Sequence, residues 1–242
     1  PSDNHKYFVN NFSRVNTVPK SELRNSDGSL VMNLEEADLS ELFNSGYQFP
    51  ETFKAKAEDG ITNLYGVMYK PFNFDNKKKY PLLEYVYPGP QTESVNKSFS
   101  VRMDRLDRMA QLGFVVITLG NRGGHPHRSK WYHNYGYGNL RDYGLADKKY
   151  LAEQLANKHS FIDINKVGIY GHSGGGFMST AAILVYPDFF KAAYSQAGNH
   201  DNSMYNSWWS ETHHGVKEEI AELIESVDKN SNKIHEAADV IY

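Results

Sequence analysis

The 242-residue sequence contains no cysteine. This absence excludes a disulfide framework, a thiolate nucleophile and a cysteine-based zinc site. No run approaches the ~18 consecutive apolar residues that a membrane-spanning helix needs. The formal net charge is only −3, so the chain also lacks the basic surface that nucleic-acid partners require. What remains is the composition of a globular protein, with 23% charged and 40% hydrophobic residues.

The sequence starts at Pro1, without an initiator methionine and without the basic and apolar regions of a signal peptide. We therefore expect it to be cut from a longer protein. Residues 1–50 differ from the remainder, with short strand candidates at 6–9 and 29–32 and a short helix candidate at 34–43. They predict a β-rich edge. The alternative is a disordered leader, since such polar stretches often bury too little apolar surface to fold.

From residue 53 onward, strand and helix patterns alternate. The first two strand candidates flank Glu58-Asp59-Gly60, a hairpin signal. Later strand candidates are nearly continuous apolar runs, typical of strands buried on both faces. Apolar stripes at helical spacing separate them, and one of these includes Tyr150. In chain order the segments are strands at 53–57, 64–69 and 81–87, a helix around 103–110, a strand at 113–119, a helix over 140–155, a strand at 167–170, a helix at 177–186 and a strand at 190–195.

This alternation predicts a mostly parallel sheet with right-handed crossovers and helices on both faces. An antiparallel hairpin leads the series, and a glycine-rich turn follows the fifth strand. That strand order is typical of the α/β-hydrolase fold, which we predict for residues 51–242.

The glycine-rich turn places Ser173 between Gly171 and Gly175, after a strand and before a helix. In this context G-x-S-x-G indicates a nucleophile elbow, whose turn is too tight for a Cβ at either glycine. The helix N-terminus, beginning with the N–H of Gly174, would stabilise a developing oxyanion. The alternative is a glycine-rich loop without chemistry.

Six motifs along the chain occur in a recognisable order. They are EDGITNLYGVMYKP (58–71), KKYPLLEYVYPGP (78–90), LGNRGG (119–124), YGNLRDYGLADKKYLAEQL (137–155), GHSGGGF (171–177) and AGNHDNSMYNSWWSETHHG (197–215). Together they resemble the catalytic domain of the prolyl oligopeptidase family of serine peptidases, and most closely its dipeptidyl peptidase IV branch.

The resemblance implies a role for five residues. Ser173 would be the nucleophile, and the Tyr87 hydroxyl and the Gly174 N–H would hold the oxyanion. Tyr205 and Trp209 would line the pocket for a substrate proline or alanine. The alternatives are a packing role for Tyr87 and an aromatic core face for the other two. For Glu211 we expect a structural role.

The resemblance implies a peptidase that cleaves after proline or alanine and releases N-terminal dipeptides through an acyl-enzyme on Ser173. The substrate would be a peptide with proline or alanine at the penultimate position. No cofactor and no metal are expected, because an H-x-H spacing without carboxylates favours exposed loop histidines. These histidines are His125, His127 and His133. Arg122 and Asp142 are expected to form a structural charge pair.

A serine nucleophile also needs a base and an orienting acid. We expect both beyond residue 242, because 216–242 predicts only a charged helix and linker. Asp201 lies where some hydrolases place the acid, but the resembled family gives it no such role. The histidines after Ser173 are His200, His213, His214 and His235. By this interpretation residues 1–50 are a β-rich remnant of a propeller with its connector, and 51–242 are a C-terminally incomplete catalytic domain.

Two other functions stay open from sequence. One is an esterase or acyl-peptide hydrolase on the same fold. The other is a catalytically inactive fragment that acts as an interaction module. The resemblance favours an extracytoplasmic location and leaves a homodimer open, whereas no residue in this sequence supports exopeptidase over endopeptidase action.

Overall fold

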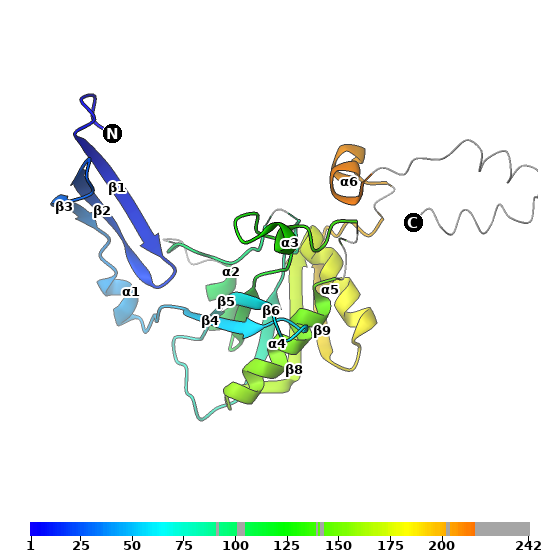
Figure 1. Ribbon diagram of the computed structural model, residues 1–242. Coiled ribbons are helices and arrows are strands. Elements are labelled where there is room, and N and C mark those ends of the chain that lie inside the picture. Colours follow the sequence, from blue (N-terminus) through cyan, green and yellow to red (C-terminus); the bar gives the residue numbers. More distant parts are fainter. Residues whose placement is uncertain (91, 101–104, 139, 141–142, 202–203, 216–242) are drawn as a thin grey trace, which may run out of the picture.

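The computed structural model describes the chain except for residues 91, 101–104, 139, 141–142, 202–203 and 216–242. Its main feature is a six-stranded sheet with the order β4-β5-β7-β6-β8-β9 (Figure 1). The strands are β4 (Glu51–Lys56), β5 (Asn63–Tyr69), β6 (Tyr80–Tyr85), β7 (Val115–Leu119), β8 (Ile162–His172) and β9 (Phe190–Gln196).

The strand directions match the predicted fold. β4 and β5 form the antiparallel hairpin, and β5 also pairs antiparallel with β7. The pairs β6–β7, β6–β8 and β8–β9 are parallel. Since β8 is the fifth strand of this sheet in chain order, the α/β-hydrolase prediction is confirmed.

Helices cover both faces of the sheet. α4 (Leu145–Lys158) and α5 (Gly174–Val185) pack on one face, and α2 (Arg105–Gln111) packs on the other. The sequence predicted that Tyr150 belongs to the buried stripe of α4. This prediction is wrong, since Tyr150 is 38% exposed. Lys148 is buried instead. It lies on the same face of the helix as the buried residues Leu145, Leu151 and Leu155.

A second, smaller sheet precedes the main one. It is an antiparallel meander of β1 (Tyr7–Arg14), β2 (Thr17–Asn25) and β3 (Leu30–Glu36), and lies apart from the six-stranded sheet in Figure 1. The β-rich character of residues 1–50 is therefore correct, but the helix prediction for 34–43 is partly wrong. β3 continues to Glu36, and α1 (Ser40–Asn44) begins only after Asp38, whose carboxylate accepts from the Ser40 N–H.

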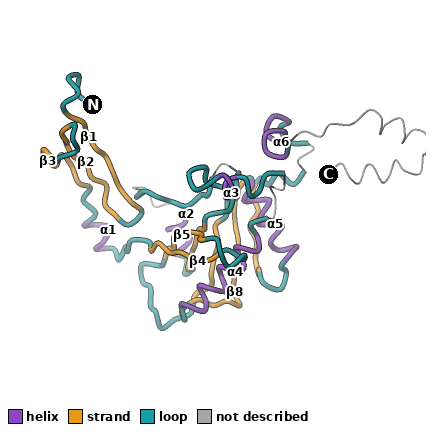
Figure 2. The backbone as a smooth tube through the Cα atoms, in the orientation of Figure 1, coloured by secondary structure: helices purple, strands orange, loops and turns teal. Residues whose placement is uncertain are grey.

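Loops follow the parallel strands at their carboxyl ends, with the short helices α3 (Lys130–His133) and α6 (Ser207–His214) among them (Figure 2). This edge of a parallel α/β sheet is where ligands generally bind. Within the described part of the chain, no helix has the length and apolarity to cross a membrane.

Candidate active site

Ser173 lies at the junction between β8 and α5 in a strained conformation. Its φ is 58° and its ψ is −120°, a region that non-glycine residues rarely adopt. The Ser173 N–H donates to the Gln196 carbonyl at the end of β9 (2.8 Å), and the Phe177 N–H donates to the Ser173 carbonyl (3.0 Å). Ser173 therefore follows the strand in a strained backbone conformation, and hydrogen bonds on both sides hold it in place.

The two glycines of the motif are required by backbone contacts. A Cβ on Gly171 would lie 2.3 Å from the Val86 carbonyl oxygen, and a Cβ on Gly175 would lie 2.0 Å from the same atom. No side chain could therefore occupy either position without moving the loop that follows β6. The steric reason predicted for the G-x-S-x-G spacing is confirmed.

A cavity of about 180 Å³ opens beside Ser173. All five residues that the sequence singled out line it: Tyr87, Ser173, Gly174, Tyr205 and Trp209. The sequence interpretation did not assign the other described lining residues, which are Pro88, Gly89, Pro90, Leu140, Phe177 and Asn199. Segments far apart in the sequence thus meet at one small site, while the chemical role of each residue stays a prediction.

The loop after β6 faces the N-terminus of α5. The Val86 N–H donates to the Tyr170 carbonyl (2.9 Å), and the Gly89 N–H donates to the Tyr87 carbonyl (3.0 Å), which tightens the loop at the cavity. A Cβ on Gly174 would lie 3.2 Å from the Pro88 carbonyl oxygen. Tyr87 and the first turn of α5 are therefore neighbours, as two donors to one oxyanion must be.

Tyr205 and Trp209 form an aromatic corner of the cavity. Their ring centroids are 5.4 Å apart with an interplanar angle of 88°, and the Asn206 side chain caps α6 by accepting from the Trp209 N–H. Tyr205 is 46% exposed and Trp209 is half-buried, so they are not a core face. Such an edge-to-face pair offers a rigid apolar surface to a small ring.

None of the described cavity-lining residues is a histidine. His213 packs its ring against Trp209 (5.0 Å), and its pKa is lowered by burial and by neighbouring His214 and His133. The His200 ring lies 5.7 Å from that of Phe177, and His235 lies outside the described residues. Among the described residues that line the cavity, none is therefore assigned as the base for Ser173.

The prediction of exposed loop histidines is correct for His127, whereas His125 is half-buried and His133 is half-buried at the end of α3. The His125 and His127 rings lie 5.3 Å apart, and His133 Nδ1 lies 3.1 Å from the Gly123 carbonyl oxygen. Among the described residues, no group of three or more histidine, cysteine, aspartate or glutamate side chains could hold a metal ion.

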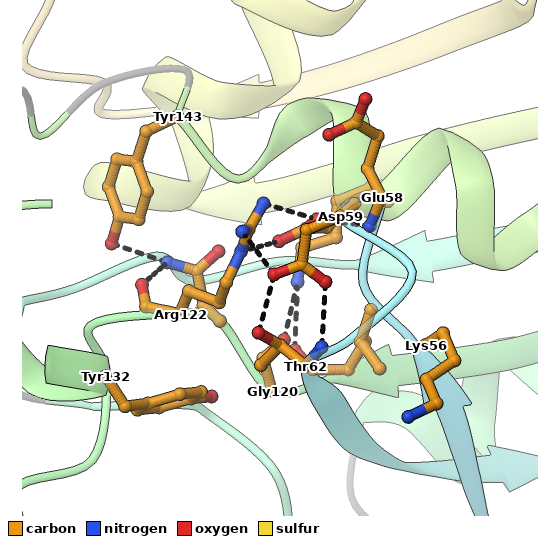
Figure 3. A network of polar contacts seen from close by, with 12 residues as sticks. Lys56, Glu58, Asp59, Thr62, Gly120, Arg122, Tyr132 and Tyr143 are labelled. Atoms are coloured by element: carbon orange, nitrogen blue, oxygen red, sulfur yellow. Dashed lines mark hydrogen bonds and ion pairs between the residues drawn. The ribbon is translucent and has the colours of Figure 1, made fainter. Parts of the chain in front are cut away.

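Arg122 anchors a polar network beside the site (Figure 3). Its Nε and Nη2 atoms donate to Asp147, both at 2.8 Å, and its Nη1 donates to Asp59 at 3.0 Å. The Tyr135 ring lies 4.1 Å from the guanidinium carbon. Asp142, the partner expected from sequence, lies outside the described residues. Sequence reasoning missed two partners, Asp59 and Asp147, the latter a buried carboxylate on α4.

The chain matches the model of the prolyl oligopeptidase family over residues 99–237. It is 36% identical over 152 residues to dipeptidyl peptidase 8 of Homo sapiens, covering 62% of this chain and 17% of that protein. It is 31% identical over 201 residues to an Aspergillus clavatus protein described as a dipeptidyl-aminopeptidase B, covering 81% of this chain and 21% of that protein.

Among solved structures, the chain is similar to one from Bacteroides ovatus described as a dipeptidyl aminopeptidase IV. The TM-score is 0.75 at 29% identity, over 87% of this chain and 30% of that one. The chain therefore spans about a fifth of the length of the curated relatives named above and less than a third of this structure.

Proposed function

This chain belongs to the prolyl oligopeptidase family, and from that premise we propose that it carries the nucleophile, oxyanion hole and proline pocket of a serine dipeptidyl peptidase. The observation that carries the proposal is the shared cavity at the strained Ser173. Tyr87, Gly174, Tyr205 and Trp209 all line this cavity.

In the proposed reaction the Ser173 oxygen attacks the scissile carbonyl carbon. A base that is not among the described lining residues takes the serine proton and later gives it to the leaving amine. The Tyr87 hydroxyl and the Gly174 N–H donate to the oxyanion of the tetrahedral intermediate. Collapse of the intermediate expels the protonated amine of the leaving peptide and leaves an acyl-enzyme on Ser173. Water then hydrolyses this ester.

The specificity for proline is proposed from the aromatic lining of the cavity. The cavity of about 180 Å³ has two aromatic walls, which offer a rigid apolar surface to a pyrrolidine ring or an alanine methyl group. We also propose that β1–β3 belong to the end of a β-propeller that joins the catalytic domain through α1. Release of dipeptides, rather than internal cleavage, is proposed from the similarity to dipeptidyl peptidases.

The test uses the full-length protein that contains this sequence. Three substrates are compared: a Gly-Pro amide, an acyl ester and an acylated peptide. The proposal predicts that the Gly-Pro amide is cleaved with the highest kcat/KM and that Ser173→Ala abolishes this cleavage. A preference for the acylated peptide or the ester would favour the alternative hydrolase. No turnover of any of the three would favour an interaction module.

A further inference from the structure

Glu84 is a charged residue in the centre of the apolar core. It lies on β6 between Leu82 and Val86, and its direct partners on β7 and β8 are Ile117 and Ile169. It is 1% exposed, and neither carboxylate oxygen has a hydrogen-bond partner among the described residues. A buried carboxylate without hydrogen bonds is costly, so this residue calls for an explanation.

Lys148 is the cation whose charge acts on Glu84, and it reaches the same core from α4. Lys148 is 2% exposed, and its Nζ donates to the Leu119 carbonyl at 2.9 Å and lies 3.5 Å from that of Gly120. Both carbonyls belong to the end of β7, where the loop bearing Arg122 begins. Lys148 thus ties helix α4 to the carboxyl edge of the sheet.

The pair lies directly beneath the oxyanion loop. Tyr85 pairs with Thr118 on β7 and with Tyr170 on β8, so Leu119 is level with Val86, the residue before Tyr87. From the strand rise of about 3.3 Å and strand spacing of about 4.8 Å, Lys148 Nζ is roughly 10 Å from the place where an oxyanion would form.

We propose that Glu84 and Lys148 act as positioning residues that hold a net positive charge beneath the oxyanion loop while Glu84 carries a proton. This inference rests on the proposed function. Uncharged Glu84 and protonated Lys148 together carry a charge of +1, which favours the developing negative charge above it. Ionisation of Glu84 cancels that charge and weakens the oxyanion hole.

Burial supports the protonated form of Glu84, and the nearby carboxylates support the protonated form of Lys148. Burial raises the pKa of Glu84 to about 8 against the opposing effect of Lys148. Burial lowers the pKa of Lys148, and the charges of Glu84, Asp147 and Glu93 oppose that shift. Because two backbone carbonyls also hold the ammonium group, we assign the proton lost near pH 8 to Glu84.

The expected change in rate follows from Coulomb's law. A unit charge about 10 Å from the oxyanion, at an effective dielectric constant of about 20, changes the rate by on the order of tenfold. The rate of oxyanion formation should therefore fall by on the order of tenfold as pH rises through about 8.

The test measures how fast a fluorophosphonate phosphonylates Ser173 in the full-length protein between pH 6 and 10. This probe has no amine to titrate. The wild type should lose rate between pH 7 and 9, whereas Glu84→Gln should keep its rate. Lys148→Met should be slower by on the order of tenfold at pH 7 and should show no such fall. Glu22→Gln, at the other buried glutamate among the described residues, is the control and should follow the wild type.

Circular dichroism and the melting temperature at pH 7 verify that each variant folds. An unchanged alkaline fall in Glu84→Gln, or an unchanged rate in Lys148→Met, would overturn the inference while labelling at Ser173 leaves the proposed function intact. If the wild type is not labelled at Ser173, the proposed function and this inference fail together.

Discussion

Replacing Arg122 with methionine should strongly destabilise the protein. Arg122 and Asp147 have side chains only 7% and 1% exposed, and the methionine would leave the Asp147 carboxylate in the core without its cation. Among the described residues, the donor that would remain is the Glu58 N–H, at 2.9 Å. Removing one partner of a buried ion pair costs about 3–5 kcal/mol, because the remaining charge stays desolvated.

A surface ion pair on the same helix provides the control. Lys149 and Glu153 are closer, at 2.6 Å, but their side chains are 33% and 39% exposed. Lys149→Met should therefore cost about 0.5 kcal/mol or less. Burial, rather than distance, is predicted to decide the difference between the two variants.

The assay is thermal and urea unfolding of the wild type and both variants. For a chain of this size each kcal/mol corresponds to roughly 2–4 °C, so Arg122→Met should lower Tm by roughly 6–20 °C. Adding Asp147→Leu to Arg122→Met should recover much of the loss, because neither charge of this buried ion pair remains. A loss below about 1 kcal/mol in Arg122→Met, or an equal loss in Lys149→Met, would refute the reasoning.

Three further changes have definite expected results. Gly171→Ala places a Cβ 2.3 Å from the Val86 carbonyl oxygen and should cost about 3 kcal/mol in urea unfolding, whereas Gly174→Ala, with 3.2 Å to its nearest atom, should cost under about 1 kcal/mol. Tyr87→Phe in the full-length protein should lower kcat for a Gly-Pro amide by about 10²–10³-fold with little change in KM, and an unchanged kcat would contradict its role. At Asp59, partial desolvation is outweighed by hydrogen bonds from Thr62 and Ile61 and by the Arg122 charge, which lower its pKa from 3.8 to about 2. Its stabilising effect is therefore present above about pH 3.8 and lost as pH falls through about 2, so the stability difference between wild type and Asp59→Asn should shrink over that window, and a constant difference would disprove it.

The elbow and the main sheet could be predicted from sequence because their determinants are local. The glycine spacing around Ser173 predicts one tight turn. The apolar runs of β6 and β7 predict strands that are buried on both faces. By contrast, β2 (Thr17–Asn25) escaped prediction because it contains Pro19 and polar residues and lies in a thin, half-exposed sheet. Its strand character comes from pairing with β1 and β3 rather than from its own pattern.

The polar core was harder to predict for a different reason. Glu84 stands alone in an apolar strand and Lys148 interrupts an apolar helix stripe, and both signals were visible in the sequence. The spacing of apolar residues, however, predicts which face of a helix or strand is buried. It does not predict which charged side chains come close together there. The partner of Arg122 was missed likewise, since Asp147 becomes its neighbour only when α4 packs on the sheet.

The central claim is that Ser173 is the nucleophile of this site. The most direct measurement is fluorophosphonate labelling of the full-length protein at neutral pH, followed by peptide mapping of the modified residue. The account predicts one stoichiometric label, on Ser173, and none in Ser173→Ala. A label on another residue, or undiminished labelling of Ser173→Ala, would contradict it.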